Sequence, residues 1–188
     1  MPFPLETERL ILRQFKETDV EAFLAYRNDP QVYRYQGWRI PYERSLAVEF
    51  IEAQRLADPT FEGEWFQTAL ELKSSHILIG DVGYFPRKGY HGQAHLGYTL
   101  ARPFWGQGYA REAVSRVIDY LMDELKLHRI IADCDTENTS SIRLLEWLGF
   151  RREAHHVESY WLGDRWGDEY DYALLDGEWK ARFLLGQT

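Results

Sequence analysis

The chain has 188 residues, of which 45% are hydrophobic and 15% aromatic, and a chain of this size buries roughly 70% of its unfolded surface as one domain. We therefore expect residues 1–188 to form a single domain. The formal net charge of −8 speaks against nucleic acid or an anionic membrane as the main partner and mildly favours a cationic one. Neither a long apolar run nor a signal-peptide pattern is present, so we expect a soluble, cytoplasmic protein without a membrane partner.

The hydrophobic pattern alternates between strand-like and helix-like periods. In chain order we expect a strand near Arg9–Phe15, a helix from about Thr18, a helix over Tyr42–Ala57, strands near Glu64–Glu71, His76–Phe85 and Gln93–Leu100, a helix from Ala110, a strand over Arg129–Asp135, a helix opened by Asn138, and strands around Arg151–Leu162 and Trp166–Leu175. This alternation indicates an α/β protein (α+β mixed sheet) with helices on both faces.

A glycine-containing turn stands between the strand that ends at Leu100 and the periodic helix that follows. It contains Gly106-Gln107-Gly108, and helix-initial N–H groups together with glycines without a Cβ suit a phosphate group. The turn does not match a dinucleotide fingerprint, because Arg111 stands where the third glycine belongs. A P-loop string is also missing from the chain, which disfavours nucleotide hydrolysis.

A second polar cluster, Asn138-Thr139-Ser140-Ser141, opens the helix that ends before Gly149-Phe150. These residue types are what a helix N-terminus prefers, so helix capping explains part of this cluster. The cluster nevertheless follows a strand, as the glycine turn does.

Several further fragments are found in a specific order along the chain. They are Thr7-Glu8-Arg9-Leu10-Ile11-Leu12-Arg13, Asn28-Asp29-Pro30, Ile79-Gly80-Asp81-Val82-Gly83, Leu96-Gly97-Tyr98, the turn from Pro103 to Ala110 with Glu112-Ala113, Asn138-x-x-Ser141 up to Leu148-Gly149-Phe150, Tyr172-Ala173-Leu174-Leu175, and Glu178-Trp179. In this order they resemble the GNAT superfamily of acetyl-coenzyme A dependent N-acetyltransferases, in the branch named for ribosomal-protein-alanine acetylation. The resemblance covers nearly the whole chain, and it departs at Pro103, where the family often carries Gln or Arg.

The resemblance implies a GNAT-like acyl-CoA N-acyltransferase fold of about seven strands, with acetyl-CoA as cosubstrate. It places the pantetheine arm along the strand Leu96–Leu100, with the phosphates at Arg102 and the amides of residues 106–111. The cofactor-binding residues expected on this basis are Tyr98, Leu100, Arg102, Trp105, Gly106, Gln107, Gly108, Tyr109, Ala110, Arg111, Asn138 and Ser141.

Acetyl transfer to an amine needs a neutral amine, a stabilised oxyanion and a leaving thiolate that is held or protonated. By resemblance, the hydroxyl of Ser141 lies beside the sulfur, where it would act as general acid. Two candidates remain for the general base. His95 stands where many relatives carry Glu, and Glu158 alternates with His156 and Tyr160 on one face of a late strand.

The acceptor is a primary amine, either a protein N-terminal α-amine or a small amine such as an aminoglycoside or polyamine. Tyr33, Trp38 and Trp161 are candidates for lining its pocket, although such aromatic residues also serve as core or homodimer contacts. No metal site is expected, because His91 and His95 lack further ligands. The single cysteine, Cys134, is expected in the core. The alternative function is a GNAT-like regulatory or structural module that binds CoA without turnover.

Overall fold

The computed structural model describes residues 3–163 and 165–184. Within these residues one mixed sheet contains eight strands in the order β1-β2-β3-β4-β5-β6-β8-β7. The strands are β1 (Leu5–Glu6), β2 (Leu10–Arg13), β3 (Phe66–Leu72), β4 (Leu78–Pro86), β5 (Gln93–Leu100), β6 (Arg129–Asp135), β7 (Arg151–Trp161) and β8 (Trp166–Leu175). Neighbouring strands are antiparallel except for the β5–β6 pair, which is parallel.

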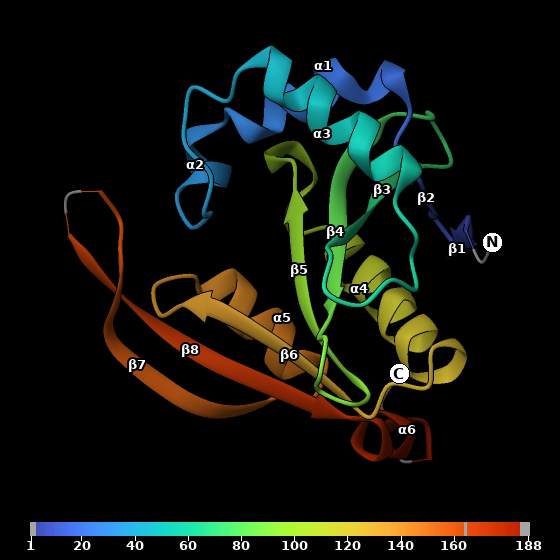
Figure 1. Ribbon diagram of the computed structural model, residues 1–188, viewed down its shortest axis with the longest axis vertical. Coiled ribbons are helices and arrows are strands. Elements are labelled where there is room, and N and C mark those ends of the chain that lie inside the picture. The colour runs from blue at the N-terminus through green and yellow to red at the C-terminus, as the bar shows by residue number, and fades with distance from the viewer. Residues whose placement is uncertain (1–2, 164, 185–188) are drawn as a thin grey trace.

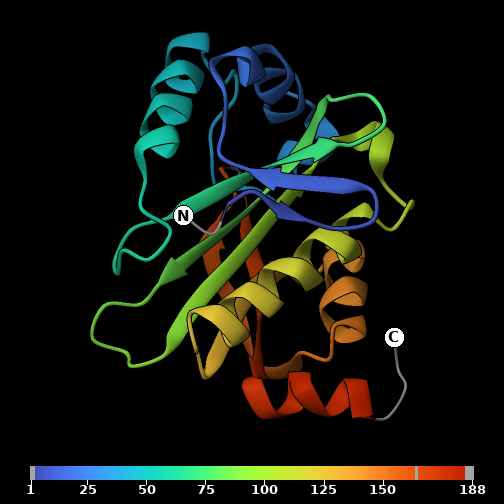
Figure 2. The same cartoon turned by 90° about the vertical axis from the view of Figure 1, so that its right-hand side faces the viewer.

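Helices cover both faces of this sheet (Figures 1 and 2). They are α1 (Val20–Arg27), α2 (Pro30–Tyr33), α3 (Arg44–Leu56), α4 (Tyr109–Asp119), α5 (Thr139–Trp147) and α6 (Asp176–Leu184), with 3-10 turns η1 (Glu17–Asp19) and η2 (Arg102–Phe104) and a π-helical turn η3 (Tyr120–Glu124). The larger core joins α4 and α5 to one face, and the smaller core joins α1 and α3 to the other. The sheet thus separates two apolar layers.

The two central parallel strands pair over only part of their length. Their register contains three pairs, from Gln93↔Arg129 to His95↔Ile131. Beyond these pairs β5 runs on to Leu100 and β6 to Asp135, and the strands separate toward their C-terminal ends, as Figure 1 shows. The sheet therefore opens in its middle, between β5 on one side and β6 with α5 on the other.

Helix α4 packs by the periodicity that the sequence shows. Its fully buried residues Ala113, Val114, Val117 and Ile118 lie on one face, as expected for an amphipathic helix on a sheet. Burial of each of the larger side chains, Val114, Val117 and Ile118, contributes about 1.5–3 kcal/mol to the stability of the fold. This packing fixes the start of α4 at the open edge of β5.

The expected α/β mixed sheet with helices on both faces is confirmed, and Cys134 is buried in the core as predicted. Burial raises the pKa of its thiol to about 12, which keeps it protonated. Three elements were not predicted: the two-residue β1, the four-residue α2, and the nine-residue α6, which has a glycine in its first turn. In the described part of the chain, no helix is long and apolar enough to cross a membrane.

Candidate active site

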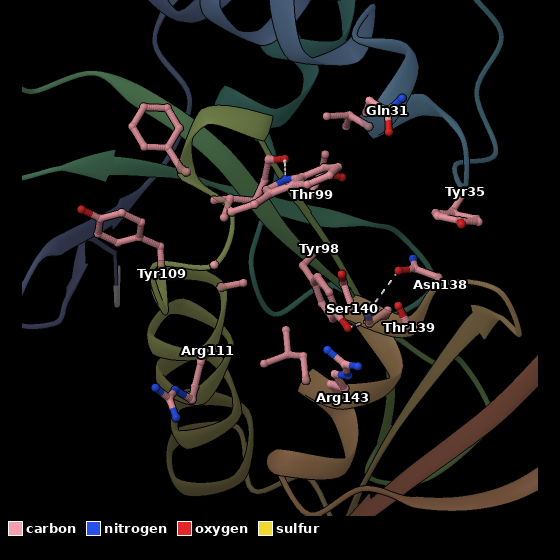
Figure 3. A pocket seen from close by; sticks show the side chains of 18 of the residues that line it. Gln31, Tyr35, Tyr98, Thr99, Tyr109, Arg111, Asn138, Thr139, Ser140 and Arg143 are labelled. Carbon is pink, nitrogen blue, oxygen red and sulfur yellow. Dashed lines mark hydrogen bonds between the residues drawn. The ribbon is translucent and has the colours of Figure 1, made fainter.

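A cavity of about 650 Å³ lies where β5 and β6 separate (Figure 3). Its walls come from β5, the glycine turn, α4, α5, and α2 with the segment after it. The predicted cofactor residues that line it are Tyr98, Leu100, Trp105, Gly106, Gly108, Tyr109, Ala110, Arg111, Asn138 and Ser141. Residues from distant parts of the sequence thus meet in one place.

The open edge of β5 offers backbone groups to this cavity. Ala101 N–H donates to the carbonyl of Ile79 at 2.8 Å, and Thr99 pairs with β4 in the same register. Because backbone groups alternate along a strand, those of Tyr98 and Leu100 point the other way, toward the gap. The indole of Trp105 donates to the Leu100 carbonyl at 2.7 Å, so the groups of Tyr98 remain for an extended ligand.

The glycine turn presents the N-terminus of α4 to the cavity. Gly106 and Gly108 have φ of +72° and +82°, values that glycine adopts without the Cβ penalty of other residues. The first intrahelical bond runs from Glu112 N–H to the Gly108 carbonyl. The preceding N–H groups therefore have no intrahelical partner, which is the property that lets helix N-termini bind anions.

Thr7 and Arg9, near the start of the chain, hold this turn in place through Glu112. The Glu112 carboxylate accepts from the Thr7 hydroxyl at 2.5 Å, from Arg9 N–H at 2.7 Å and from Arg9 Nε at 2.6 Å. Arg9 also donates to the Gln107 carbonyl at 2.9 Å, and its guanidinium lies 4.3 Å from the ring centroid of Tyr109. Burial opposes ionisation of Glu112, but the bonds from Thr7 and Arg9 outweigh it and lower its pKa. Sequence reasoning noted the Thr7–Arg9 fragment but not this role.

A tyrosine and a serine meet inside the cavity. Tyr98 reaches from β5 to α5, where its hydroxyl lies 2.6 Å from the hydroxyl of Ser141; in Figure 3 it points toward the start of that helix. Asn138 caps α5 by accepting from Ser141 N–H at 3.1 Å, which fixes the serine backbone. Burial raises the pKa of Tyr98, although the Ser141 bond opposes this. The phenol therefore stays protonated at neutral pH.

The sequence matches the acetyltransferase (GNAT) domain family over residues 9–151. The chain belongs to the GNAT acetyltransferase family. It is 35% identical over 175 residues to an uncharacterized N-acetyltransferase, p20, of Bacillus licheniformis, covering 93% of this chain and 97% of that protein. A solved GNAT-family acetyltransferase from Bacillus anthracis superposes with a TM-score of 0.80 at 32% identity, over 93% of this chain and 99% of the other.

Two relatives carry names that state an acceptor. The spermidine N(1)-acetyltransferase of Vibrio cholerae is 25% identical over 93% of this chain and 97% of its own length. The ribosomal protein uS5-alanine N-acetyltransferase of Escherichia coli is 31% identical over 60% of this chain and 50% of its own length. The predicted GNAT family, with relatives in the ribosomal-protein-alanine branch, is confirmed.

His95 of this acetyltransferase lies at the narrow end of the opening, outside the cavity lining. Its Nδ1 is 3.4 Å from Asp133 Oδ1 on β6. The His95 bond lowers the pKa of Asp133 against the effect of burial, and burial with the nearby Asp133 raises the pKa of Glu169 on β8 to about 7. Because side chains alternate along strands, these three residues lie on the sheet face opposite Tyr98.

Glu158 lies in an irregular part of β7. A register shift falls between His156 and Tyr160, and Glu158 has a φ of +49°. The register pairs His156 with Glu169 and Tyr160 with Gly167, so these two residues share a face as predicted, whereas Glu158 lies within the bulge between them. Its side chain is exposed and does not line the cavity.

Two predicted cofactor residues lie outside the cavity lining. Arg102 is 61% exposed and its Nε lies 3.0 Å from the carboxylate of Asp29. The side chain of Gln107 donates to the Pro103 carbonyl at 2.8 Å, which closes the turn on itself. Arg102 precedes the turn and Gln107 lies within it, but the orientation of their side chains depends on partners that sequence spacing does not reveal.

The three aromatic residues predicted for the acceptor pocket also lie outside the lining. The ring centroid of Trp38 lies 3.8 Å from the buried Arg27 guanidinium, and Trp161 contacts Trp166 edge to face at the exposed end of β7. Tyr33 ends α2, whereas Gln31 and Tyr35 on either side of it line the cavity.

Residues that sequence reasoning missed line the α5 side of the cavity. Besides Ser141, this helix contributes Ser140, Arg143, Leu144 and Trp147. Their spacing of three, four and seven residues from Ser140 places them on one helical face, so the pattern was available in the sequence. Among the described residues, no group of three or more His, Cys, Asp or Glu side chains is arranged to hold a metal ion.

Proposed function

We propose that this GNAT acetyltransferase transfers an acetyl group from acetyl-CoA to a primary amine. Ser141 would donate a proton to the leaving sulfur, and His95, on the opposite face of the opened sheet, would accept a proton from the amine. The observation that carries the proposal is the arrangement in one cavity of the α4 N-terminus, the unpaired edge of β5 and the Tyr98–Ser141 pair. The helix N-terminus suits the phosphates of acetyl-CoA, the strand edge suits its extended pantetheine arm, and the hydroxyl pair suits its thioester sulfur. The three features follow one another along the cavity in that order.

The cavity fits acetyl-CoA in its chemistry. The amides that precede Glu112 would hold the pyrophosphate, because the positive φ of Gly106 and Gly108 leaves the backbone uncovered there. The peptide groups of Tyr98 would bond the amides of the pantetheine arm as an added strand would. A backbone N–H at the same edge would stabilise the oxyanion, an interaction worth about 2.7–4 kcal/mol in other enzymes.

The reaction moves two protons. The amine nitrogen attacks the thioester carbonyl carbon, the C–N bond forms, and the C–S bond breaks as the tetrahedral intermediate collapses. The nitrogen loses a proton, and the departing thiolate gains one or is held by a hydrogen bond. Ser141 would donate to the sulfur, with Tyr98 donating to Ser141 in turn.

His95 is the better placed of the two candidate bases. It lies on β5 three residues before Tyr98, and Asp133 approaches its Nδ1. A carboxylate at one ring nitrogen orients the imidazole and leaves the other nitrogen to accept a proton. Glu158 lies on the exposed bulge of β7, away from the cavity lining, so it would need a rearrangement or a water chain to act.

The acceptor is proposed to be a positively charged small amine that approaches the face carrying His95. Asp133 and Glu169 lie on that face, and Asp135 follows on β6, so negative charge accumulates where the amine would enter. Coulomb attraction favours a polycation there. The relative named for spermidine matches nearly its full length, whereas the relative named for ribosomal protein alanine matches half of its own, so a protein N-terminal amine is the second candidate.

The test is release of free CoA thiol from acetyl-CoA with a panel that contains spermidine, an aminoglycoside and an alanine-initiated peptide. We expect turnover with one class and a large loss in Ser141→Ala. Thiol release with the amines but not with the peptide supports the small-amine acceptor, and the reverse assigns a protein N-terminus. A protein that binds CoA tightly but releases no thiol with any amine would instead be a non-catalytic CoA-binding module.

A further inference from the structure

An aromatic pair lies beside His95, on the sheet face opposite Tyr98. The ring centroids of Trp65, which directly precedes β3, and Phe85 of β4 are 5.7 Å apart. Phe85 pairs with His95 across β4 and β5, and residues paired in this way share a face, with Cβ atoms about 4.5–5.5 Å apart. Because β4 and β6 lie on the two sides of β5, the aromatic pair and Asp133 flank His95 from opposite sides.

A glycine makes room for the indole of Trp65. Gly97 follows His95 by two residues on β5 and therefore shares its face, at a spacing of roughly 6.6 Å. A Cβ at Gly97 would lie 3.8 Å from both Cη2 and Cζ3 of the indole, which is ordinary contact distance. The six-membered ring of Trp65 thus extends across β4 and rests over β5 next to His95, in a place that a longer side chain at position 97 would occupy.

The start of β3 holds Trp65 in place but leaves its ring accessible. The Trp65 carbonyl accepts from Gln54 Nε2 of α3 at 3.1 Å, and Gln67 N–H donates to Gln54 Oε1 at 2.7 Å. Trp65 is nevertheless 43% exposed. The rings of three other tryptophans each have an arginine of this chain over them, whereas no cation lies over Trp65 among the described residues. The ring is therefore available to a cation from solution.

Carboxylates form the wall on the other side of His95. Asp133 Oδ1 lies 3.4 Å from His95 Nδ1, and Asp133 pairs with Asp171 on β8, two residues from Glu169. Carboxylates attract any cation, whereas an indole face also favours the alkyl chain that carries the charge. An aliphatic ammonium ion matches both walls, because its charge suits the carboxylates and its methylene groups suit the aromatic pair.

We propose that Trp65 is a specificity-determining residue of the acceptor site: its indole binds the non-reacting ammonium group of a linear diamine or polyamine whose other nitrogen lies at His95. The proposal rests on the proposed function and narrows its acceptor. A short alkylene chain between two nitrogens spans the roughly 6.6 Å from His95 to the ring over Gly97. The reacting nitrogen must be neutral, so the charge that the indole recognises is that of the second nitrogen. An acceptor with a single amine lacks this contact.

The test compares kcat/KM for putrescine (1,4-diaminobutane) and n-butylamine, which differ only in the second amino group, by thiol release from acetyl-CoA. Wild type should prefer putrescine. In Trp65→Leu the putrescine-to-butylamine ratio should fall about 3- to 10-fold, the effect of a partly desolvated cation–π contact, mainly through the KM for putrescine. Trp65→Phe should keep part of the preference, because phenylalanine binds cations more weakly than tryptophan does. The change of this ratio between variants is independent of the different pKa values of the two amines.

Trp166→Leu is the matched control. Trp166 is 54% exposed, close to the 43% of Trp65, and contacts Trp161 at the exposed end of β7, so the ratio should remain that of wild type. Equal losses with both amines in Trp65→Leu, or no preference in wild type, would overturn the subsite while the proposed acetyl transfer stands. Wild type that releases thiol with the peptide alone would overturn the subsite and the small-amine acceptor, and no release with any acceptor would overturn acetyl transfer as well.

Discussion

Removing the Tyr98 hydroxyl tests whether this tyrosine positions the serine that serves the leaving group. In Tyr98→Phe the ring remains in place, and only the 2.6 Å contact with the Ser141 hydroxyl is lost. Ser141 is 9% exposed, so water does not readily replace the lost partner. The serine hydroxyl would then rotate more freely, and fewer enzyme molecules would present its proton to the sulfur.

The size of the effect follows from the single hydrogen bond involved. A neutral hydrogen bond contributes about 0.5–1.5 kcal/mol net, which corresponds to roughly a 2- to 12-fold change in rate. We therefore expect Tyr98→Phe to lower kcat by about 3- to 10-fold with little change in the KM for acetyl-CoA. Ser141→Ala should lower kcat further, because general acid catalysis typically contributes about 10²–10⁴-fold.

The double-mutant cycle of these two changes, measured by thiol release under conditions where chemistry limits turnover, distinguishes positioning from direct proton donation. If Tyr98 acts through Ser141, the double variant should be no slower than Ser141→Ala alone, because the tyrosine has nothing left to position. Full additivity of the two losses would show that Tyr98 acts independently. An unchanged kcat in Tyr98→Phe would refute the positioning role.

Three further predictions concern the surroundings of the cavity. Glu112→Gln should lower the free energy of unfolding by about 1–2 kcal/mol at pH 7 in thermal or denaturant unfolding; because the stabilisation from the lowered pKa of Glu112 is complete above its unfolded value of 4.5 and is lost as the pH falls through the lower folded value, the difference from wild type should shrink in acid, and a constant difference would argue against the ion pair. His95→Gln should remove the acidic limb of the kcat/KM profile while Glu158→Gln leaves it in place, and the reverse pattern would transfer the role of base to Glu158. Burial and the nearby Asp133 raise the pKa of Glu169 to about 7 against 4.5 unfolded, so stability that is fully present below pH 4.5 is lost as the pH rises through 7; Glu169→Gln should therefore gain stability relative to wild type between pH 5 and 8, and a pH-independent difference in melting temperature would contradict the raised pKa.

The sequence predicted most of the regular elements because their periods are local properties. The local sequence predicts the apolar face of α4 and the glycine turn before it, because helical spacing and positive φ restrict which residue types can occupy those positions. The Asn138 cap is recognisable for the same reason. Short elements such as β1 depend on pairing with a distant strand, which no local pattern encodes.

The parts of the site that sequence reasoning missed depend on tertiary contacts. The contact of Tyr98 with Ser141 exists because β5 and β6 separate, and that separation arises from how the whole sheet is paired. Arg102 faces Asp29, a partner far away in sequence, so its position beside the turn did not reveal its orientation. The register shift around Glu158 falls in residues whose sequence pattern is that of an ordinary strand, so the sequence did not reveal it. Arg143 and Trp147 lie on the same helical face as Ser140, which spacing predicts, but that this face lines the cavity became visible only in the fold.

The central claim is that the α4 N-terminus holds the phosphates of acetyl-CoA, and calorimetric titration of Gly108→Asp against Gly108→Asn tests it most directly. Both side chains must adopt the φ of +82° at this position, which Asp and Asn tolerate better than most residues, so the pair differs mainly in charge. We predict that Gly108→Asp binds acetyl-CoA at least about tenfold more weakly than Gly108→Asn, because a carboxylate at the turn repels the pyrophosphate. Equal affinities for acetyl-CoA in the two folded variants would contradict the account.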